Sequence, residues 1–162
     1  MLGGQQVLFQ VAFLVTAVLS ITPTKKCSGR ALEPVKLEIG DCTTHPCIIK
    51  RNTTVPVDIH FKLDRDAREL FSNVYAIILS IPFPFFGVDG SSVCNSIFDT
   101  DGKTKVSCPL KKDHVYRYIN TFKILDRYPK IDLEVHWSFN EKKNGRELIC
   151  FELPSKITNY NS

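Results

Sequence analysis

Apolar and polar side chains alternate with a period of two along most of the chain. The run VPVDIHFKL (55–63) places its Val, Ile, Phe and Leu side chains on one face, and IDLEVHWSF (131–139) repeats this arrangement with larger side chains. Looser or shorter alternation occurs at 35–39 and 116–124, and a last strand-like run covers 147–153. Because successive side chains of a strand point to opposite faces, we predict antiparallel strands with one buried face and one face toward water.

Two segments depart from this alternation. DRDARELFSNV (64–74) carries apolar side chains at helical spacing, which predicts at most a turn or two of helix. LSIPFPFFGV (79–88) is uncharged and combines two prolines with three phenylalanines. Since proline has no N–H to donate to a sheet, we predict that this segment lies at a sheet edge.

Turn-forming residues separate the strand-like runs, and Asn144-Gly145 is a strong hairpin signal. About seven strands with regular turns and no internal repeats predict one β-sandwich of two sheets. The Cys…Trp…Cys order of antibody domains is missing, because Trp137 precedes only Cys150. The inward faces either fill a packed core or line a cavity for a lipid, and periodicity alone does not separate these alternatives.

The amino-terminal region contains a mostly apolar run, Val7–Ile21, ahead of the first charges at Lys25 and Lys26. This run is short for a membrane-spanning helix and has the length of a secretory signal sequence. We predict a signal peptide over residues 1–20 and a single mature domain over residues 21–162. An uncleaved membrane anchor is the alternative.

The charge of the mature chain is mildly positive. All 21 basic and 17 acidic residues lie beyond residue 20, which gives a formal net charge of +4. The basic residues are scattered and form no arginine-rich helix or basic–aromatic stripe, so the pattern argues against nucleic-acid binding. The mild positive charge instead favours weak attraction to anionic membrane surfaces.

The chain has six cysteines, an even number that predicts three disulfides in an oxidising compartment. Spacing alone allows about 15 pairings. A short local loop, a polar hairpin and a link between the two ends of the domain are the arrangement that the spacing suggests. The corresponding pairs are Cys42–Cys47, Cys94–Cys108 and Cys27–Cys150.

No catalytic constellation is present in the sequence. It has no GxSxG elbow, no HExxH pair and no phosphate-binding glycine loop, so we expect neither an enzyme nor a bound cofactor or metal. Zinc bound by Cys42, His45 and Cys47 is the competing interpretation of these cysteines. It would require free thiols and lacks a second ligand pair.

Three polar positions carry candidate functions. His60 and His136 fall on the polar faces of predicted strands, where we expect solvated side chains; pH sensing is the alternative. Asn52-Thr53-Thr54 is an N-glycosylation sequon in a predicted turn, so Asn52 is a candidate glycan attachment site.

Four segments together carry a family resemblance. LEIGDCTTHPCII, IPFPFFGVDG, CPLKKDHVYRYINTFKILDRYPKIDLEVHW and CFELP resemble the Niemann–Pick type C2-like proteins of the ML-domain (lipid-recognition) family, including its arthropod members. The resemblance extends from Cys27 to Pro154. It implies an all-β, immunoglobulin-like, two-sheet antiparallel sandwich with an apolar cavity between the sheets. It also implies the three disulfide pairs that the spacing suggests.

The resemblance assigns lipid-binding roles by position. It places Phe85 as the main pocket phenylalanine, Ile124 as an apolar pocket residue, and Tyr128, followed by Pro129, at the pocket mouth. Further residues match positions near or along the pocket wall. These are Val57, Ile59, Val74, Val135 and Trp137.

The resemblance implies a secreted carrier that binds a sterol or related hydrophobic ligand between its sheets and transfers it between membranes or partners. The alternatives are innate-immune recognition of bacterial lipids and carriage of fatty-acid-type chemical signals. Anionic membranes and a lipid-accepting receptor are the expected transient partners. We expect a monomer that is extracellular, with the lysosomal lumen as the other location.

One difference bears on the lysosomal role. In the vertebrate lysosomal protein a His-Gly pair precedes the Pro-Phe-Pro segment and helps it act on acidic membranes. The matching position here is Tyr75-Ala76. This difference favours lipid binding over lysosomal sterol hand-off as the expected function.

Overall fold

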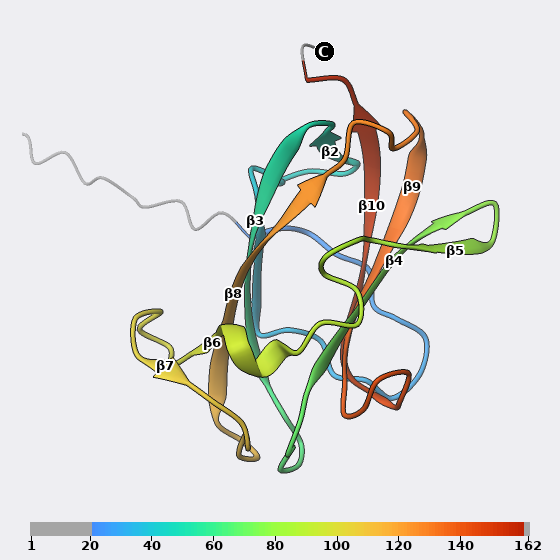
Figure 1. Ribbon diagram of the computed structural model, residues 1–162. Coiled ribbons are helices and arrows are strands. Elements are labelled where there is room, and N and C mark those ends of the chain that lie inside the picture. The colour runs from blue at the N-terminus through green and yellow to red at the C-terminus, as the bar shows by residue number, and fades with distance from the viewer. Residues whose placement is uncertain (1–20, 161–162) are drawn as a thin grey trace, which may run out of the picture.

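The chain forms two five-stranded sheets that pack face to face (Figure 1). The computed structural model describes residues 21–160, so the predicted signal peptide (1–20) lies outside the described residues. One sheet has the strand order β1-β3-β8-β6-β7, and the other has the order β2-β10-β9-β4-β5. The elements are β1 (Lys36–Ile39), β2 (Cys47–Lys50), β3 (Thr53–Lys62), β4 (Phe71–Ile78), β5 (Ile81–Pro84), the 3₁₀ turn η1 (Val93–Ser96), β6 (Ile97–Phe98), β7 (Lys105–Val106), β8 (Val115–Ile124), β9 (Asp132–Asn140) and β10 (Glu147–Thr158).

The architecture confirms the predicted immunoglobulin-like β-sandwich. Long antiparallel ladders join β3 to β8 and β9 to both β4 and β10. Among the described strands, β2 and β10 form a parallel pair, which the sequence pattern did not predict. No helix within residues 21–160 has the length and apolarity needed to cross a bilayer.

The predicted inward faces form the core between the sheets. From Val57 to Phe61 in β3, and from Leu133 to Phe139 in β9, the side chains at alternate positions are buried. Phe61 and Tyr118 each meet Phe139 edge-on in the interior, and such aromatic pairs stabilise the core beyond the burial of their apolar area. The alternation therefore identified most of the core.

The helical turn expected over 64–74 is not formed. Ala67 instead makes an isolated antiparallel bridge to Leu110, and β4 begins at Phe71. In β4 the buried inward side chains are Ser72, Val74 and Ala76. Because one of these side chains is polar and another is small, the strand period is weak here, and the helical spacing of larger side chains was misleading.

The three disulfides connect the predicted pairs: Cys27–Cys150, Cys42–Cys47 and Cys94–Cys108. The first joins the amino-terminal segment to β10, and the second closes the loop between β1 and β2. Both sulfurs of the Cys42–Cys47 pair are thus in a disulfide, which rules out the alternative zinc site.

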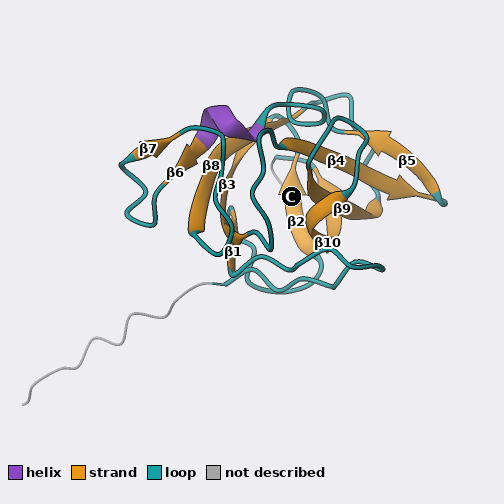
Figure 2. Cartoon of the chain, turned by 90° about the horizontal axis from the view of Figure 1, so that it is seen from below, coloured by secondary structure: helices purple, strands orange, loops and turns teal. Residues whose placement is uncertain are grey.

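The β4–β5 hairpin projects from one side of the sandwich (Figures 1 and 2). Its turn residues, Leu79 and Ser80, both have positive φ angles, of 49° and 66°. This matches the backbone of a two-residue turn that follows the twist of the strands. β5 lies at the sheet edge, as predicted, and Pro82 and Pro84 remove two N–H groups from that edge, which protects it against pairing with another strand.

Candidate functional site

An apolar pocket of about 570 Å³ opens between the β4–β5 hairpin and the loop from β8 to β9. Almost all of its lining is hydrocarbon, and Arg127 is its only charged side chain. Below, "the apolar pocket" denotes the space lined by Ala76, Ile78, Phe83, Pro84, Phe85, Phe86, Arg127, Tyr128, Pro129, Ile131 and Ile157.

Phe85 is the innermost aromatic residue of this lining. Ile81, Phe83 and Phe85 occupy alternate positions and share one face, but they are 56%, 47% and 4% exposed. The hairpin carries the first two beyond the body of the sandwich, whereas Phe85 lies over it. The Phe85 N–H donates to the Val74 carbonyl at 2.9 Å, which continues the pairing with β4 one residue past β5. The edge strand thus positions Phe85 in the pocket.

A series of aromatic rings runs from the pocket into the core. Phe85 contacts Tyr128 edge-on, with ring centroids 5.7 Å apart, and contacts Phe122 at 5.9 Å. Phe122 in turn contacts Trp137 at 5.8 Å. Edge-to-face contacts of this kind fix ring orientation, so Phe85 separates the open pocket from the buried aromatic core.

Tyr128 stands at the mouth of the apolar pocket on the loop between β8 and β9. Its hydroxyl accepts a hydrogen bond from the Phe86 N–H at 3.4 Å. Arg51, from the turn between β2 and β3, donates to the carbonyl of Asp126 at 2.7 Å and more distantly to that of Tyr128 at 3.5 Å. It also donates to the Asn159 side chain at 2.6 Å. Arg51 therefore ties the mouth loop to the end of the chain.

Replacing Arg51 with methionine should loosen the mouth loop. Hydrogen bonds from a charged donor contribute about 1.5–3 kcal/mol each, so we expect amide exchange in residues 125–130 to accelerate at least about tenfold. Hydrogen-exchange mass spectrometry measures this. Arg51→Lys retains the charge and should give a smaller effect. Arg127→Met removes a charge from the loop itself and serves as the control. Equal exchange in the wild type and Arg51→Met would contradict the role of Arg51.

The sequence-predicted lipid-binding residues fall into two groups. Phe85, Tyr128 and Pro129 line the apolar pocket. The remainder are buried between the sheets and do not line it. They are Val57, Ile59, Val74, Ile124, Val135 and Trp137.

The sequence analysis missed several residues that form or support the pocket. Ala76, Ile78 and Ile157 line it without having been predicted, and Arg51 supports its mouth from outside. Ile131 was recognised only as part of an inward strand face. The apolar alternation that continues along β10 to Ile157 could have identified that residue, but Arg51 carries no comparable sequence signal.

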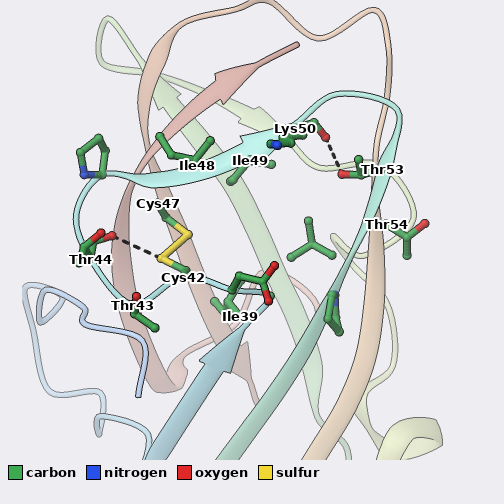
Figure 3. A pocket seen from close by; sticks show the side chains of 15 residues that line it. Ile39, Cys42, Thr43, Thr44, Cys47, Ile48, Ile49, Lys50, Thr53 and Thr54 are labelled. Atoms are coloured by element: carbon green, nitrogen blue, oxygen red, sulfur yellow. Dashed lines mark hydrogen bonds between the residues drawn. A yellow bond between two sulfur atoms is a disulfide. The ribbon is translucent and has the colours of Figure 1, made fainter. Parts of the chain in front are cut away.

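A second pocket, of about 390 Å³, lies between β1, β2 and the start of β3 (Figure 3). The Cys42–Cys47 disulfide and Ile39 face it, and Thr43, Thr44 and Thr53 lie along its border. Because its lining is more polar and has no aromatic side chain, it suits a lipid less well than the apolar pocket does.

His136 lies on the outer face of β9 but is only 7% exposed, which corrects the expectation of a solvated side chain. The sulfur of Cys150 lies 3.4 Å from its Nε2 atom, and the Tyr75 ring stacks on it with centroids 4.6 Å apart. Burial disfavours the charged imidazole, but a 2.7 Å hydrogen bond to Glu147 and the nearby Glu152 outweigh this and raise the pKa of His136. The hydrogen bond from His136 lowers the pKa of Glu147.

Cys27, His136 and Cys150 also gather potential metal-ligand atoms within 4.8 Å of one another. The two sulfurs are bonded to each other in the disulfide, so they are not available as thiolate ligands. The cluster is therefore a partly buried pair of His136 and Glu147 packed on a disulfide.

This ion pair predicts a stability maximum at weakly acidic pH. The stabilisation from a raised histidine pKa is complete below the ordinary value of 6.5 and is lost as pH rises through the folded-state pKa of His136. The stabilisation from the lowered Glu147 pKa is complete above 4.5 and is lost as pH falls through its folded-state value. We expect thermal unfolding to show highest stability between these two limits.

His136→Gln should remove most of the stability loss that the wild type shows as pH rises from 6 to 8. Each unit of pKa shift between the unfolded and folded states corresponds to about 1.4 kcal/mol of unfolding free energy. Calorimetry can therefore measure the difference in pH dependence between the wild type and the variant. His45→Gln, in an exposed turn, is the matched histidine substitution. An identical pH profile for the wild type and His136→Gln would contradict the assignment.

Sequence comparison relates the chain to known proteins. The family model described as "ML domain" matches residues 22–157. NPC intracellular cholesterol transporter 2 homolog a of Drosophila melanogaster is 37% identical over 123 residues, which cover 76% of this chain and 77% of the relative. NPC intracellular cholesterol transporter 2 of Bos taurus is 26% identical over 148 residues, covering 91% and 92%.

Structural comparison gives a concordant match. The crystal structure of a Niemann–Pick type C2 protein from the Japanese carpenter ant aligns with a TM-score of 0.68 and 25% sequence identity. The alignment covers 84% of this chain and 99% of the ant protein. The two proteins therefore share the β-sandwich fold.

Proposed function

Because this chain belongs to the ML domain family, we propose that it is a non-enzymatic carrier that binds a sterol or related lipid in the apolar pocket. The observation that carries the proposal is the location of Phe85, Tyr128 and Pro129 together in this pocket. Two of the relatives described above are named as cholesterol transporters, which supports a sterol as ligand.

Burial of hydrocarbon would drive binding. Each ligand CH₂ group removed from water contributes about 0.8 kcal/mol, without need for a covalent bond. The hydrophobic effect has no preferred direction, so selectivity must come from the shape of the site and its few polar groups. Tyr128, at the mouth, is placed to meet a polar head group, while the hydrocarbon extends past Phe85 between the sheets.

Phe85 lines the apolar pocket, and the six other predicted lipid-binding residues are buried outside its lining. We therefore propose that Phe85 and Phe122 move apart on binding and that the buried wall residues then contact the ligand. These are Val57, Ile59, Val74, Ile124, Val135 and Trp137. Their apolar side chains already face the space between the sheets.

The hairpin beside the pocket provides the proposed membrane contact. Leu79 at its tip is 93% exposed, and Ile81, Phe83 and Phe86 are also exposed. Exposed apolar groups of this kind mark interaction surfaces. With the hairpin in the bilayer surface, the pocket mouth would face the membrane and lipid could pass without crossing water.

Leu79→Ser tests this transfer step. Removing one large apolar side chain from a membrane contact costs about 1.5–3 kcal/mol, so we expect at least about tenfold slower transfer of a fluorescent sterol between anionic vesicles. Equilibrium affinity for the same sterol in solution should be unchanged, because Leu79 does not line the pocket. Unchanged transfer would contradict the hairpin as the membrane contact.

We also propose that the mature protein is a monomer in a secretory or lysosomal compartment. Three disulfides support an oxidising environment. Asn52 and Thr54 of the sequon are both exposed in and after the turn between β2 and β3, so a glycan at Asn52 would project into solvent. Enzymatic removal of N-glycans followed by mass measurement tests this modification.

A further inference from the structure

Arg127 places a positive charge in the otherwise apolar lining of the pocket. It lies on the loop between β8 and β9, directly before Tyr128. Within residues 21–160 its guanidinium has no ion pair and no hydrogen bond, and it rests over the Phe86 ring, 5.2 Å from the ring centroid. An aromatic ring attracts a cation but does not neutralise its charge. The described part of the chain therefore supplies no counter-ion for this charge.

The other basic side chains near the mouth differ from Arg127. Arg51 already donates to two main-chain carbonyls and to a side-chain amide oxygen. Lys156 pairs with Asp132 at 3.6 Å. Lys130 is exposed on the same loop but does not line the apolar pocket. Arg127 is thus the cation that the loop presents to a lipid in this pocket.

Tyr128 supplies a second donor at the same place. Its hydroxyl oxygen accepts the hydrogen bond from the Phe86 N–H at 3.4 Å, and no acceptor within residues 21–160 takes the hydroxyl hydrogen. A phenol can accept one hydrogen bond and donate another, so this hydrogen is available to a ligand. Because both side chains line the apolar pocket, its mouth offers a guanidinium and a hydroxyl donor.

On the basis of the proposed function, we infer that Arg127 and Tyr128 bind the anionic head group of a lipid at the mouth of the apolar pocket. A guanidinium donates two parallel hydrogen bonds to the oxygens of a carboxylate, sulfate or phosphate, which a neutral hydroxyl cannot accept in the same way. The anion remains at the rim, where Phe86 is 62% exposed, so it keeps part of its hydration while the hydrocarbon lies against the apolar lining.

Competition binding in solution tests the preference for an anionic head. Cholesterol and cholesterol sulfate share their hydrocarbon, and each is titrated against bound dehydroergosterol. We expect the wild type to bind cholesterol sulfate about tenfold more tightly, because hydrogen bonds between charged groups are the stronger ones. Arg127→Gln should remove most of this preference, and Arg127→Lys should retain part of it. Lys130→Gln removes a charge from the same loop outside the lining and should keep the wild-type preference.

Transfer between vesicles identifies where the anion resides. Neutral cholesterol is transferred from phosphatidylcholine vesicles with or without phosphatidylglycerol. A preference in solution that Arg127→Gln removes assigns the anion to the lipid held in the pocket. Equal affinities in solution, with transfer that phosphatidylglycerol accelerates and that Arg127→Gln slows more than Lys130→Gln does, assign it to a lipid still in the membrane.

Two results would overturn the inference alone. One is a preference for cholesterol sulfate that persists in Arg127→Gln. The other is equal affinity of the wild type for the two sterols together with equal effects of Arg127→Gln and Lys130→Gln on transfer. Failure of the wild type to bind either sterol would overturn the proposed function together with the inference.

Discussion

Phe85→Ala is expected to weaken sterol binding by roughly thirtyfold, because about 2 kcal/mol of aromatic burial against the ligand is lost. Phe85 is the buried aromatic residue of the pocket lining, and its ring meets both Tyr128 and Phe122. Titration with a fluorescent sterol measures the change in affinity.

The stability of this variant must be measured in parallel. Truncating a buried phenylalanine costs about 3–5 kcal/mol, so the titration belongs at a temperature well below the unfolding midpoint. Leu79→Ala provides the matched control, since this residue belongs to the same hairpin but is almost fully exposed and lies outside the pocket lining. Wild-type affinity in a folded Phe85→Ala protein would remove Phe85 from the site.

Replacing Cys27 and Cys150 together with alanine is expected to lower the free energy of unfolding by about 5 kcal/mol, if the disulfide acts by restricting the unfolded chain. These cysteines are 123 residues apart and join the amino-terminal segment to β10. Removal of this disulfide also releases the amino-terminal segment that covers His136. The stability maximum at weakly acidic pH should therefore become shallower. Denaturant unfolding at several pH values measures both effects.

The double replacement of Cys42 and Cys47 is the control for chain restriction. This pair is separated by only 5 residues. The dependence of chain entropy on loop length then predicts a loss of only about 2 kcal/mol in the free energy of unfolding. A loss from the Cys42–Cys47 variant equal to or greater than that from the Cys27–Cys150 variant would contradict the chain-restriction account.

Much of the fold could be predicted because its physical causes are local. A strand with one buried face must alternate, so Val57, Ile59 and Phe61 could be placed inward from the sequence. Proline cannot donate to a ladder, and Pro82 and Pro84 accordingly lie on an edge strand. These predictions required no knowledge of distant contacts.

The errors arose where burial depends on distant segments. The alternation along β9 assigns His136 to the polar, solvent-facing side of the strand. The amino-terminal segment and its disulfide nevertheless cover this side chain. Residues 64–74 have helical spacing, but pairing of β4 with β9 determines the structure from Phe71 onward. Arg51 acts on the mouth loop across 75 residues of sequence, which no local pattern reveals.

The lining of the apolar pocket could be predicted only in part, because it also depends on how distant segments meet. The family resemblance supplied Phe85, Tyr128 and Pro129, which the structure brings together in one pocket. Sequence spacing could not show that Phe83 and Phe85 differ so much in exposure, because this difference follows from where the hairpin leaves the body of the sandwich.

Energy transfer from Trp137 to bound dehydroergosterol tests most directly whether a sterol enters between the sheets. The protein has one tryptophan, and it lies in the core two aromatic contacts away from Phe85. We expect saturable transfer at one sterol per protein, displaced by unlabelled sterol and strongly reduced in Phe85→Ala. The absence of saturable transfer, or saturable transfer that Phe85→Ala leaves unchanged, would contradict a sterol site between the sheets.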